Sequence, residues 1–181
     1  ATAFTVDSAT QITATAPAGT GTVDVRVTTA GGTSAIGGAG DDFTYLSALT
    51  TTMAFSVDPL VIGAQGVLTV TFGNPNATVS PAFNLTVVST ATVGPPLSAG
   101  GTCTGYTLGG DANSVISFSG LSVPAGGCTV TIPYTGRNTG TAAFSFNAFT
   151  PSGLPQTPAD SLQVQVVPPA PVVTSVSPTG G

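Results

Sequence analysis

The chain has 181 residues and a formal net charge of -5, and its only charged side chains are seven Asp and two Arg. Charged residues make up 5% of the sequence, against about 25% in an ordinary soluble domain. The absence of His, Glu and Lys removes the usual general acids and bases and argues against an enzyme. Two arginines cannot neutralise a phosphate backbone, which excludes nucleic acid as a partner.

The hydrophobic content of 41% indicates a chain that buries a core rather than a disordered one. No apolar run approaches the roughly 20 residues that a membrane span requires, so we expect no membrane insertion. Alternation of apolar and polar residues predicts β-strands from one end to the other, and no stretch has the 3.6-residue period of a helix. These features together predict an all-β protein.

The predicted strands follow one another in chain order, separated by turn signals rich in Gly, Pro and Asn. In the first fifty residues the inward sets are Ile12, Ala14 and Ala16, then Val23, Val25 and Val27, with Asp24 and Arg26 together on the exposed face. The later inward sets are Leu68, Val70 and Phe72; Phe83, Leu85 and Val87; Ile116 and Phe118; Cys128, Val130, Ile132 and Tyr134; Phe144 and Phe146; and Leu162, Val164 and Val166. Short strands at this spacing are typical of β-sandwiches.

Two segments divide the chain. Residues 48–52 (A-L-T-T-T) are predicted to form a small polar joint. Residues 167–171 (V-P-P-A-P) are predicted to form a stiff, extended linker. We therefore expect a first piece at 1–47, a sandwich at 48–167, and a Pro-rich linker with one further strand at 168–181.

The outer pieces resemble parts of one repeat type. Residues 1–46 contain F-T-V-D-S-A-T-Q-I-T-A-T-A-P-A-G-T-G-T-V-D-V-R-V-T-T-A-G-G-T-S-A and then D-F-T-Y, which resembles the C-terminal half of an IPT/TIG domain, an immunoglobulin-like module. Residues 171–181, P-V-V-T-S-V-S-P-T-G-G, resemble the first strand of that family. Members in transcription factors bind DNA through basic loops, but this copy has only Arg26, so that role does not carry over.

The middle of the chain, about residues 50–167, resembles more loosely the immunoglobulin-like repeats of large bacterial exported proteins. The matching motifs are A-F-S-V-D-P-L-V-I-G, L-T-V-T-F-G-N-P-N and P-A-G-G-C-T-V-T-I. The two resemblances together imply tandem immunoglobulin-like β-sandwiches in a bacterial surface protein.

The two cysteines, Cys103 and Cys128, have 24 residues between them. Metal binding would need more ligands, and the chain has no His to supply them. A redox pair would usually be spaced C-x-x-C. A disulfide or two buried thiols remain, and we favour the disulfide, which would stabilise the fold by roughly 3.5 kcal/mol on the chain-entropy model. A disulfide implies an oxidising compartment, so the expected location is secreted or on the cell surface.

Few acidic residues are candidates for chemistry. Asp41 and Asp42 could bind calcium with help from Gly carbonyls or Asp7, but two adjacent carboxylates alone supply too few of the six to eight oxygens that calcium requires. A polar turn is the favoured interpretation, and Asp111 in G-G-D-A-N is likewise predicted to be a turn residue. We therefore expect no metal site and no cofactor.

Three kinds of sugar-related site are conceivable: a glycosidase acid pair, a carbohydrate-binding surface and N-glycosylation. Asp58 and Asp160 could pair as the two carboxyls of a glycosidase, but Asp58 lies in a D-P turn and Asp160 just before the last strand. Carbohydrate binding usually requires stacked aromatic rings, and the chain has no Trp and only three Tyr, namely Tyr45, Tyr106 and Tyr134. Asn76 and Asn84 fit the short N-glycosylation pattern, and Asn84 lies within a predicted strand. No catalytic residue is predicted.

The first piece is too short for a whole sandwich, which takes about 100 residues, even when the C-terminal segment is added to it. One explanation is that the chain is a window on a longer repeat array. The other is strand addition, in which the C-terminal segment of one copy pairs with the open sheet edge of the next. Such a head-to-tail contact generates a filament. The candidate residues are Val172, Val173, Thr174, Ser175 and Val176.

The function predicted from sequence is a non-catalytic structural module of an extracellular bacterial fibre, sheath or stalk. Its expected partners are copies of itself. The alternative is an adhesin or carbohydrate-binding module that contacts surface glycans.

Overall fold

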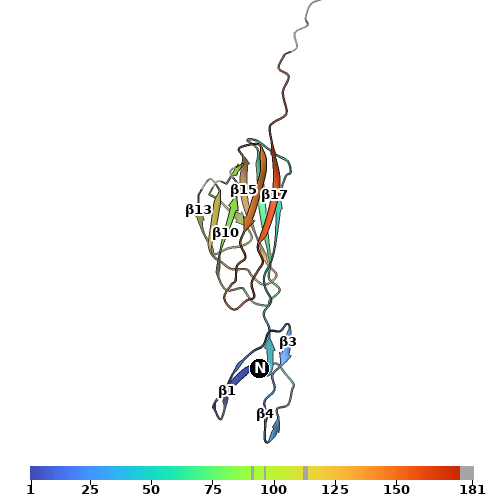
Figure 1. Ribbon diagram of the computed structural model, residues 1–181, viewed down its shortest axis with the longest axis vertical. Helices are drawn as coiled ribbons and strands as arrows, with labels where there is room; N and C mark the ends of the chain where they lie inside the picture. The colour runs from blue at the N-terminus through green and yellow to red at the C-terminus, as the bar shows by residue number, and fades with distance from the viewer. Residues whose placement is uncertain (91, 96, 112–113, 176–181) are drawn as a thin grey trace, which may run out of the picture. The chain divides into compact units, whose positions relative to one another are not determined.

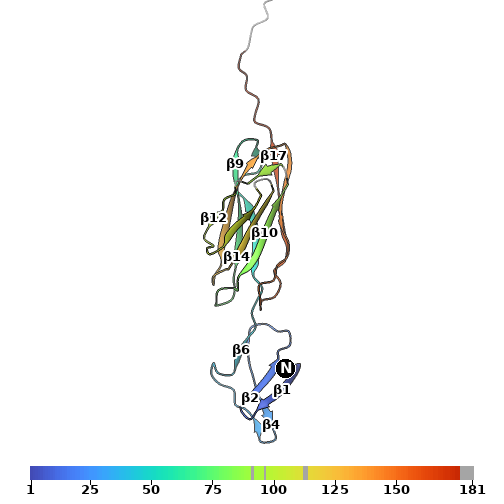
Figure 2. The same ribbon diagram turned by 90° about the vertical axis from the view of Figure 1, so that its left-hand side faces the viewer.

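The computed structural model describes residues 1–90, 92–95, 97–111 and 114–175 (Figures 1 and 2). The chain separates into two compact units, Ala1–Ser47 (unit 1) and Ala48–Gly181 (unit 2). All regular elements in the described ranges are β-strands, which confirms the all-β prediction. Within those ranges no helix could cross a membrane.

Unit 1 consists of three separate antiparallel strand pairs, β1 with β2, β3 with β6, and β4 with β5. Cross-strand registers place Val6 opposite Ile12 and Val23 opposite Phe43, so apolar side chains gather on one face of the β1–β2 pair and one face of the β3–β6 pair. The strands are β1 (Ala3–Ser8), β2 (Gln11–Thr15), β3 (Thr22–Asp24), β4 (Thr28–Thr29), β5 (Gly32–Thr33) and β6 (Asp42–Thr44).

Unit 2 is a sandwich of a six-stranded and a five-stranded sheet (Figures 1 and 2). The larger has the order β13-β14-β10-β16-β17-β8 and the smaller β11-β15-β9-β7, with β12 also pairing with β15. The strands are β7 (Thr50–Phe55), β8 (Leu60–Val61), β9 (Gln65–Gly73), β10 (Phe83–Ser89), β11 (Val93–Gly94), β12 (Gly100–Gly101), β13 (Thr107–Gly110), β14 (Val115–Leu121), β15 (Cys128–Gly136), β16 (Gly140–Phe146) and β17 (Asp160–Val167).

The core of unit 2 lies between the two sheets and is built from the alternating sets that the sequence predicted. Buried residues come from β9, β10, β14, β15, β16 and β17, with side chains of the intervening positions facing outward. Edge-to-face and stacked ring pairs, such as Tyr134 with Phe144 at 4.9 Å and Phe83 with Phe149 at 4.6 Å, fill its wider parts. The prediction of inward strand faces between residues 68 and 166 is therefore confirmed.

The prediction of a polar joint at residues 48–52 is wrong. Leu49 is only 1% exposed and belongs to the core of unit 2, and β7 already begins at Thr50. The three threonines that suggested a joint are also good strand residues, because Thr is β-branched. Burial of one leucine at the start of the sandwich decides the local structure.

The first segment of unit 2 contributes to both sheets. β7 pairs antiparallel with β9, and β8 pairs in parallel with the last strand, β17, through Leu60 opposite Val166. The change of sheet occurs at the cis peptide bond between Asp58 and Pro59. The Asp58 carboxylate accepts a hydrogen bond from the Gln165 amide at 2.9 Å, so the turn is fastened to β17.

Candidate functional site

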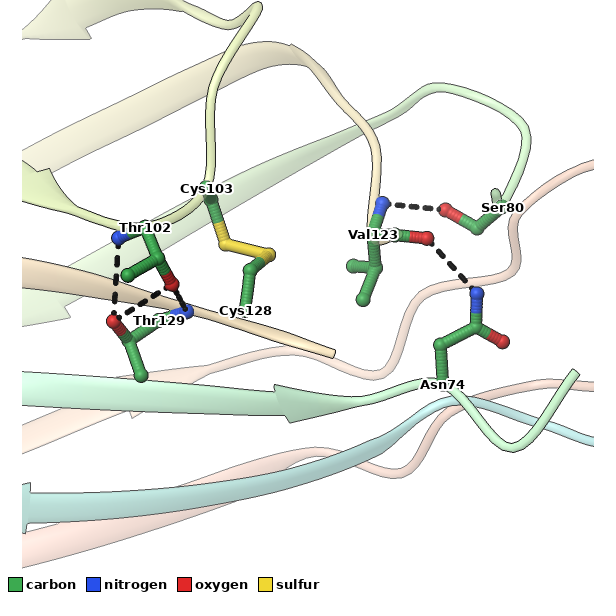
Figure 3. Close-up of a disulfide and its surroundings, with 7 residues drawn as sticks. All are labelled: Asn74, Ser80, Thr102, Cys103, Val123, Cys128 and Thr129. Carbon is green, nitrogen blue, oxygen red and sulfur yellow. Dashed lines mark hydrogen bonds between the residues drawn. A yellow bond between two sulfur atoms is a disulfide. The ribbon is translucent and has the colours of Figure 1, made fainter. Parts of the chain in front are cut away.

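Cys103 and Cys128 form a disulfide near one end of the unit 2 sandwich (Figure 3). Cys128 begins β15, and Cys103 follows β12, so the bond fastens the loop that carries β12 to the smaller sheet. Beside it, the Thr129 amide donates to the Thr102 hydroxyl at 2.9 Å, and the Cys103 amide donates to the Thr129 carbonyl at 2.9 Å. Both cysteines are buried, which marks the bond as a structural brace rather than a reactive site.

A second brace holds the segment between β14 and β15 close to the disulfide (Figure 3). The Val123 carbonyl accepts hydrogen bonds from the Asn74 side chain and the Ser80 amide, both at 2.9 Å, and the Val123 amide donates to the Ser80 hydroxyl. Asn74 and Ser80 are buried polar residues whose bonds supply partners to loop backbone that strands leave unpaired. These hydrogen bonds and the disulfide tie the loops at this end of the sandwich to the strands beside them.

The acid pair considered for glycoside hydrolysis is not formed. Asp58 is held at the Gln165 amide, which lies five residues along β17 from Asp160. Five residues of strand span roughly 17 Å, whereas the two carboxyls of a glycosidase lie about 5–9.5 Å apart. Asp160 instead accepts a hydrogen bond from the Ser161 amide at 2.8 Å. Both carboxylates have structural roles.

Three carboxylates do meet in unit 1, but not the three that the sequence suggested. Asp24, Asp41 and Asp42 place carboxylate oxygens within 4.8 Å of one another, because the β3–β6 register sets Asp24 opposite Asp42. Asp7, by contrast, accepts hydrogen bonds from the Thr5 and Thr13 hydroxyls. The cluster is largely exposed, and three carboxylates that bind through one oxygen each supply three of the six to eight oxygens that calcium takes.

The three tyrosines do not build a platform for a sugar ring. Tyr134 is fully buried, Tyr106 packs edge-to-face on Phe118 at 5.1 Å, and Tyr45 lies in the other unit against Phe43. The side chain of Asn84 is exposed on β10 and accepts a hydrogen bond from the Gly120 amide, whereas the half-buried Asn76 donates to the Asn74 side chain. Asp111 accepts hydrogen bonds from the Ser114 and Val115 amides, as expected of a turn residue.

The outer face of the smaller sheet of unit 2 carries a row of threonines. The registers place Thr52 beside Thr71 and Thr71 beside Thr129, and Thr69 pairs with Thr131 on the same face. The outward positions of β7, β9 and β15 include no charged residue. This face is therefore polar and carries no formal charge.

The feature of unit 1 that bears on function is exposure of its apolar faces. None of its residues is buried, and Phe4 and Val6 are 68% and 66% exposed. The other large apolar side chains that are at least 40% exposed there are Ile12, Val23, Val25, Val27, Ile36, Phe43 and Leu46. The expected inward set at Val23, Val25 and Val27 therefore has no layer to pack against in unit 1.

The β3–β6 pair also has two open edges. The Tyr45 amide donates to the Gly21 carbonyl, and the Val25 amide donates to the Asp41 carbonyl. The backbone N–H and C=O groups of odd-numbered residues therefore form the hydrogen bonds between the two strands. In an antiparallel ladder the alternate positions then point away from the partner strand. The backbone N–H and C=O of Asp42 and Thr44 thus face outward from β6, and those of Thr22 and Asp24 face outward from β3.

The C-terminal segment contains β-branched residues that favour strands but belong to no sheet. Residues 172–175 lie in no strand and are exposed, with Val172 at 81% and Val173 at 77%. They follow a run in which Pro168, Pro169 and Pro171 lack backbone N–H groups. Val176, the last of the five candidate residues for strand addition, lies outside the described residues.

No protein-family model matches the sequence, and no curated protein matches it. Among solved structures, similar chains include the seventh ScaB type I cohesin of Pseudobacteroides cellulosolvens (12% identity, 71% of this chain and 98% of that chain, TM-score 0.45) and a cohesin module of a Clostridium perfringens family 33 glycoside hydrolase (11%, 70% and 100%, 0.46). The collagen-binding subdomain of the Enterococcus faecalis surface protein ACE is also similar (9%, 69% and 97%, 0.35). At these identities and TM-scores, collagen binding remains a property of the Enterococcus protein alone.

Sequence reasoning missed two features of these surfaces. The Asp24–Asp42 pairing depends on the β3–β6 register, and the alternation at Val23 to Val27 combined with D-F-T-Y was the available signal for it. The two unpaired edges of the β3–β6 pair depend on which strands are neighbours, and residue periodicity does not specify neighbours.

Proposed function

We propose that this chain is a non-catalytic structural module of an extracellular bacterial fibre, sheath or stalk, and that copies join head to tail by strand addition. The observation that carries the proposal is the contrast between the two units. Unit 2 has a dense core, whereas unit 1 has paired strands with exposed apolar faces and open edges. Such edges invite pairing with a further strand.

The chemistry of the described residues favours a structural role. The residues that sequence analysis considered for catalysis, Asp58 and Asp160, are separated and hydrogen-bonded to backbone. Burial raises the pKa of Tyr134, and this side chain lies in the core rather than open to a substrate. A sandwich with few charged residues and a disulfide brace is suited to act as a spacer.

The proposed location is the cell surface or the extracellular medium. The buried Cys103–Cys128 bond is the observation that supports it, because disulfides persist in oxidising compartments. The resemblance of residues 1–46 and 171–181 to IPT/TIG repeats agrees with this location and supports an immunoglobulin-like repeat protein.

The proposal is tested by sedimentation velocity and electron microscopy of the full chain across a range of concentrations. We expect linear assemblies with no preferred closed oligomer, because a head-to-tail contact does not close. The assemblies should depend only weakly on salt, since the few charges leave apolar contacts and backbone hydrogen bonds to hold them. A chain that remains monomeric at every concentration, or assemblies that dissolve completely in high salt, would contradict it.

An adhesive or carbohydrate-binding role is the second candidate, supported by the neutral threonine row on the smaller sheet of unit 2. A glycan array probed with the full chain separates the two functions. Tight and selective binding that is lost in a Thr71→Lys variant would favour the binding module over the scaffold.

A further inference from the structure

Unit 2 shows how the beginning of an immunoglobulin-like unit contacts its last strand. β8 lies just after the first strand and pairs in parallel with β17, with Val61 opposite Val167. The Ile62 amide extends the ladder by donating to the Val167 carbonyl at 2.9 Å. Leu60 at this pairing is 1% exposed, so a strand of two residues can pair with the end of β17 and place a side chain in the core.

Unit 1 has a corresponding last strand, β6, without such a partner. Its outward backbone groups belong to Asp42 and Thr44, and among the described residues β3 is the only strand that pairs with it. Phe43 and Tyr45 lie together on one face of β6, with ring centroids 4.9 Å apart. An added strand would place alternate side chains over this face and over the opposite one.

From these observations we propose that residues 172–175 of one copy pair in parallel with the free edge of β6 in a second copy. This inference rests on the proposed function and names the acceptor edge for it. The donor carries no charge, so the carboxylates of Asp24, Asp41 and Asp42 beside the edge do not repel it. Because Val172 and Val173 are consecutive, one of them faces the Phe43 side in either register.

The Pro-rich linker supports the choice of donor. Pro168, Pro169 and Pro171 cannot donate a hydrogen bond to a strand ladder. Val172 is the first residue after Pro169 that has both a backbone N–H and a β-branched apolar side chain. An extended Pro-rich segment also loses little conformational freedom when it is fixed. The contact is heterologous, because the donor and acceptor surfaces on each copy differ.

The test compares two proline variants of the full chain, one on each edge of the β3–β6 pair. Thr44→Pro removes the outward N–H of β6, and Thr22→Pro removes the outward N–H of the residue directly opposite on β3. Both variants lose the same hydrogen bond between the Thr22 and Thr44 hydroxyls, so its loss is matched, and neither removes a backbone hydrogen bond between the two strands. We expect Thr44→Pro to weaken self-association at least tenfold in sedimentation velocity and Thr22→Pro to leave it within about twofold of the original chain.

A second arm uses mixing. A donor variant, Val172→Asp with Val173→Asp, should self-associate at least tenfold more weakly than the original chain, as Thr44→Pro should. An equimolar mixture should give one-to-one dimers, because each variant retains the surface that the other lacks. A Val79→Asp variant, which changes an exposed valine of unit 2, is the matched control and should assemble normally.

Amide hydrogen exchange on the unmodified chain keeps the result independent of how the variants fold. Assembly should slow exchange at Asp42 and Thr44 at least tenfold. Assemblies whose Asp42 and Thr44 amides exchange as in the monomer, or which are lost only in Thr22→Pro, would overturn the β6 acceptor while leaving head-to-tail assembly in place. Absence of any assembly by the unmodified chain would instead remove the proposed function itself.

Discussion

The hydroxyl of Tyr134 makes the stability of unit 2 sensitive to alkaline pH. The side chain is fully buried between the sheets, and its hydroxyl has no partner among the described residues at ordinary hydrogen-bond geometry. Burial raises the pKa of Tyr134 to about 12, and the nearby Ser89 hydroxyl offsets a smaller part of this effect. Ser89 donates its own hydrogen bond to the Ser114 carbonyl at 3.3 Å.

The sign of the pH dependence follows from comparing the folded and unfolded chains. In the unfolded chain a tyrosine ionises near pH 10, whereas in the folded unit it keeps its proton to about pH 12. Between these values ionisation lowers the free energy of the unfolded chain only, so stability is complete below pH 10 and falls as pH rises. A difference of about two pKa units corresponds to roughly 2.7 kcal/mol of unfolding free energy lost by pH 12.

Tyr134→Phe tests this reasoning because it removes the ionisable hydroxyl and keeps the ring. At pH 7 we expect its unfolding free energy to equal that of the original chain or to exceed it by up to about 1 kcal/mol, since a buried hydroxyl without a hydrogen bond is itself unfavourable. Between pH 10 and 12 the variant should gain roughly 2.7 kcal/mol relative to the original chain. Urea unfolding followed by circular dichroism at fixed pH values measures both quantities. Parallel loss of stability in the two proteins from pH 10 to 12 would refute the assignment to Tyr134.

Three further predictions concern unit 2. Replacing both Cys103 and Cys128 by Ala should lower its unfolding free energy by about 3.5 kcal/mol and its melting temperature by roughly 13 °C in calorimetry, and a reductant should shift the original chain equally; a shift below about 3 °C would contradict the brace. Gly101→Ala should destabilise by more than 3 kcal/mol in urea unfolding, because φ is +109° and the new Cβ would collide with the backbone of β15, whereas Gly63→Ala, at φ +81° in open space, should cost only about 1–2 kcal/mol. Equal effects of the two would exclude the collision. Asp58→Ala should lower unfolding free energy by about 1–2 kcal/mol through loss of its hydrogen bond to β17, with Asp160→Ala as the control expected to change it less.

Much of unit 2 could be predicted from sequence because its strands have one buried and one exposed face. Val130, Ile132 and Tyr134 alternate with Thr129, Thr131, Pro133 and Thr135, and the structure buries the first three and turns the intervening residues outward. Strand order could not be predicted in the same way, since periodicity gives the face of a strand but not its neighbour. The change of sheet between β7 and β8 depends on one turn and one side-chain hydrogen bond, and only the D-P dipeptide marked it.

The same pattern led to a different outcome in unit 1. Val23, Val25 and Val27 alternate as regularly as the β15 set, yet they are 41%, 51% and 41% exposed. The difference is the second layer: in unit 2 each apolar strand face meets a face of the opposite sheet, whereas unit 1 consists of three separate strand pairs with no buried residue. A two-stranded pair is marginally stable in water, so each of these faces lowers its free energy when a further strand or layer covers it. Alternation therefore specifies which side chains require cover, and the supply of that cover is a property of the neighbouring chain segment.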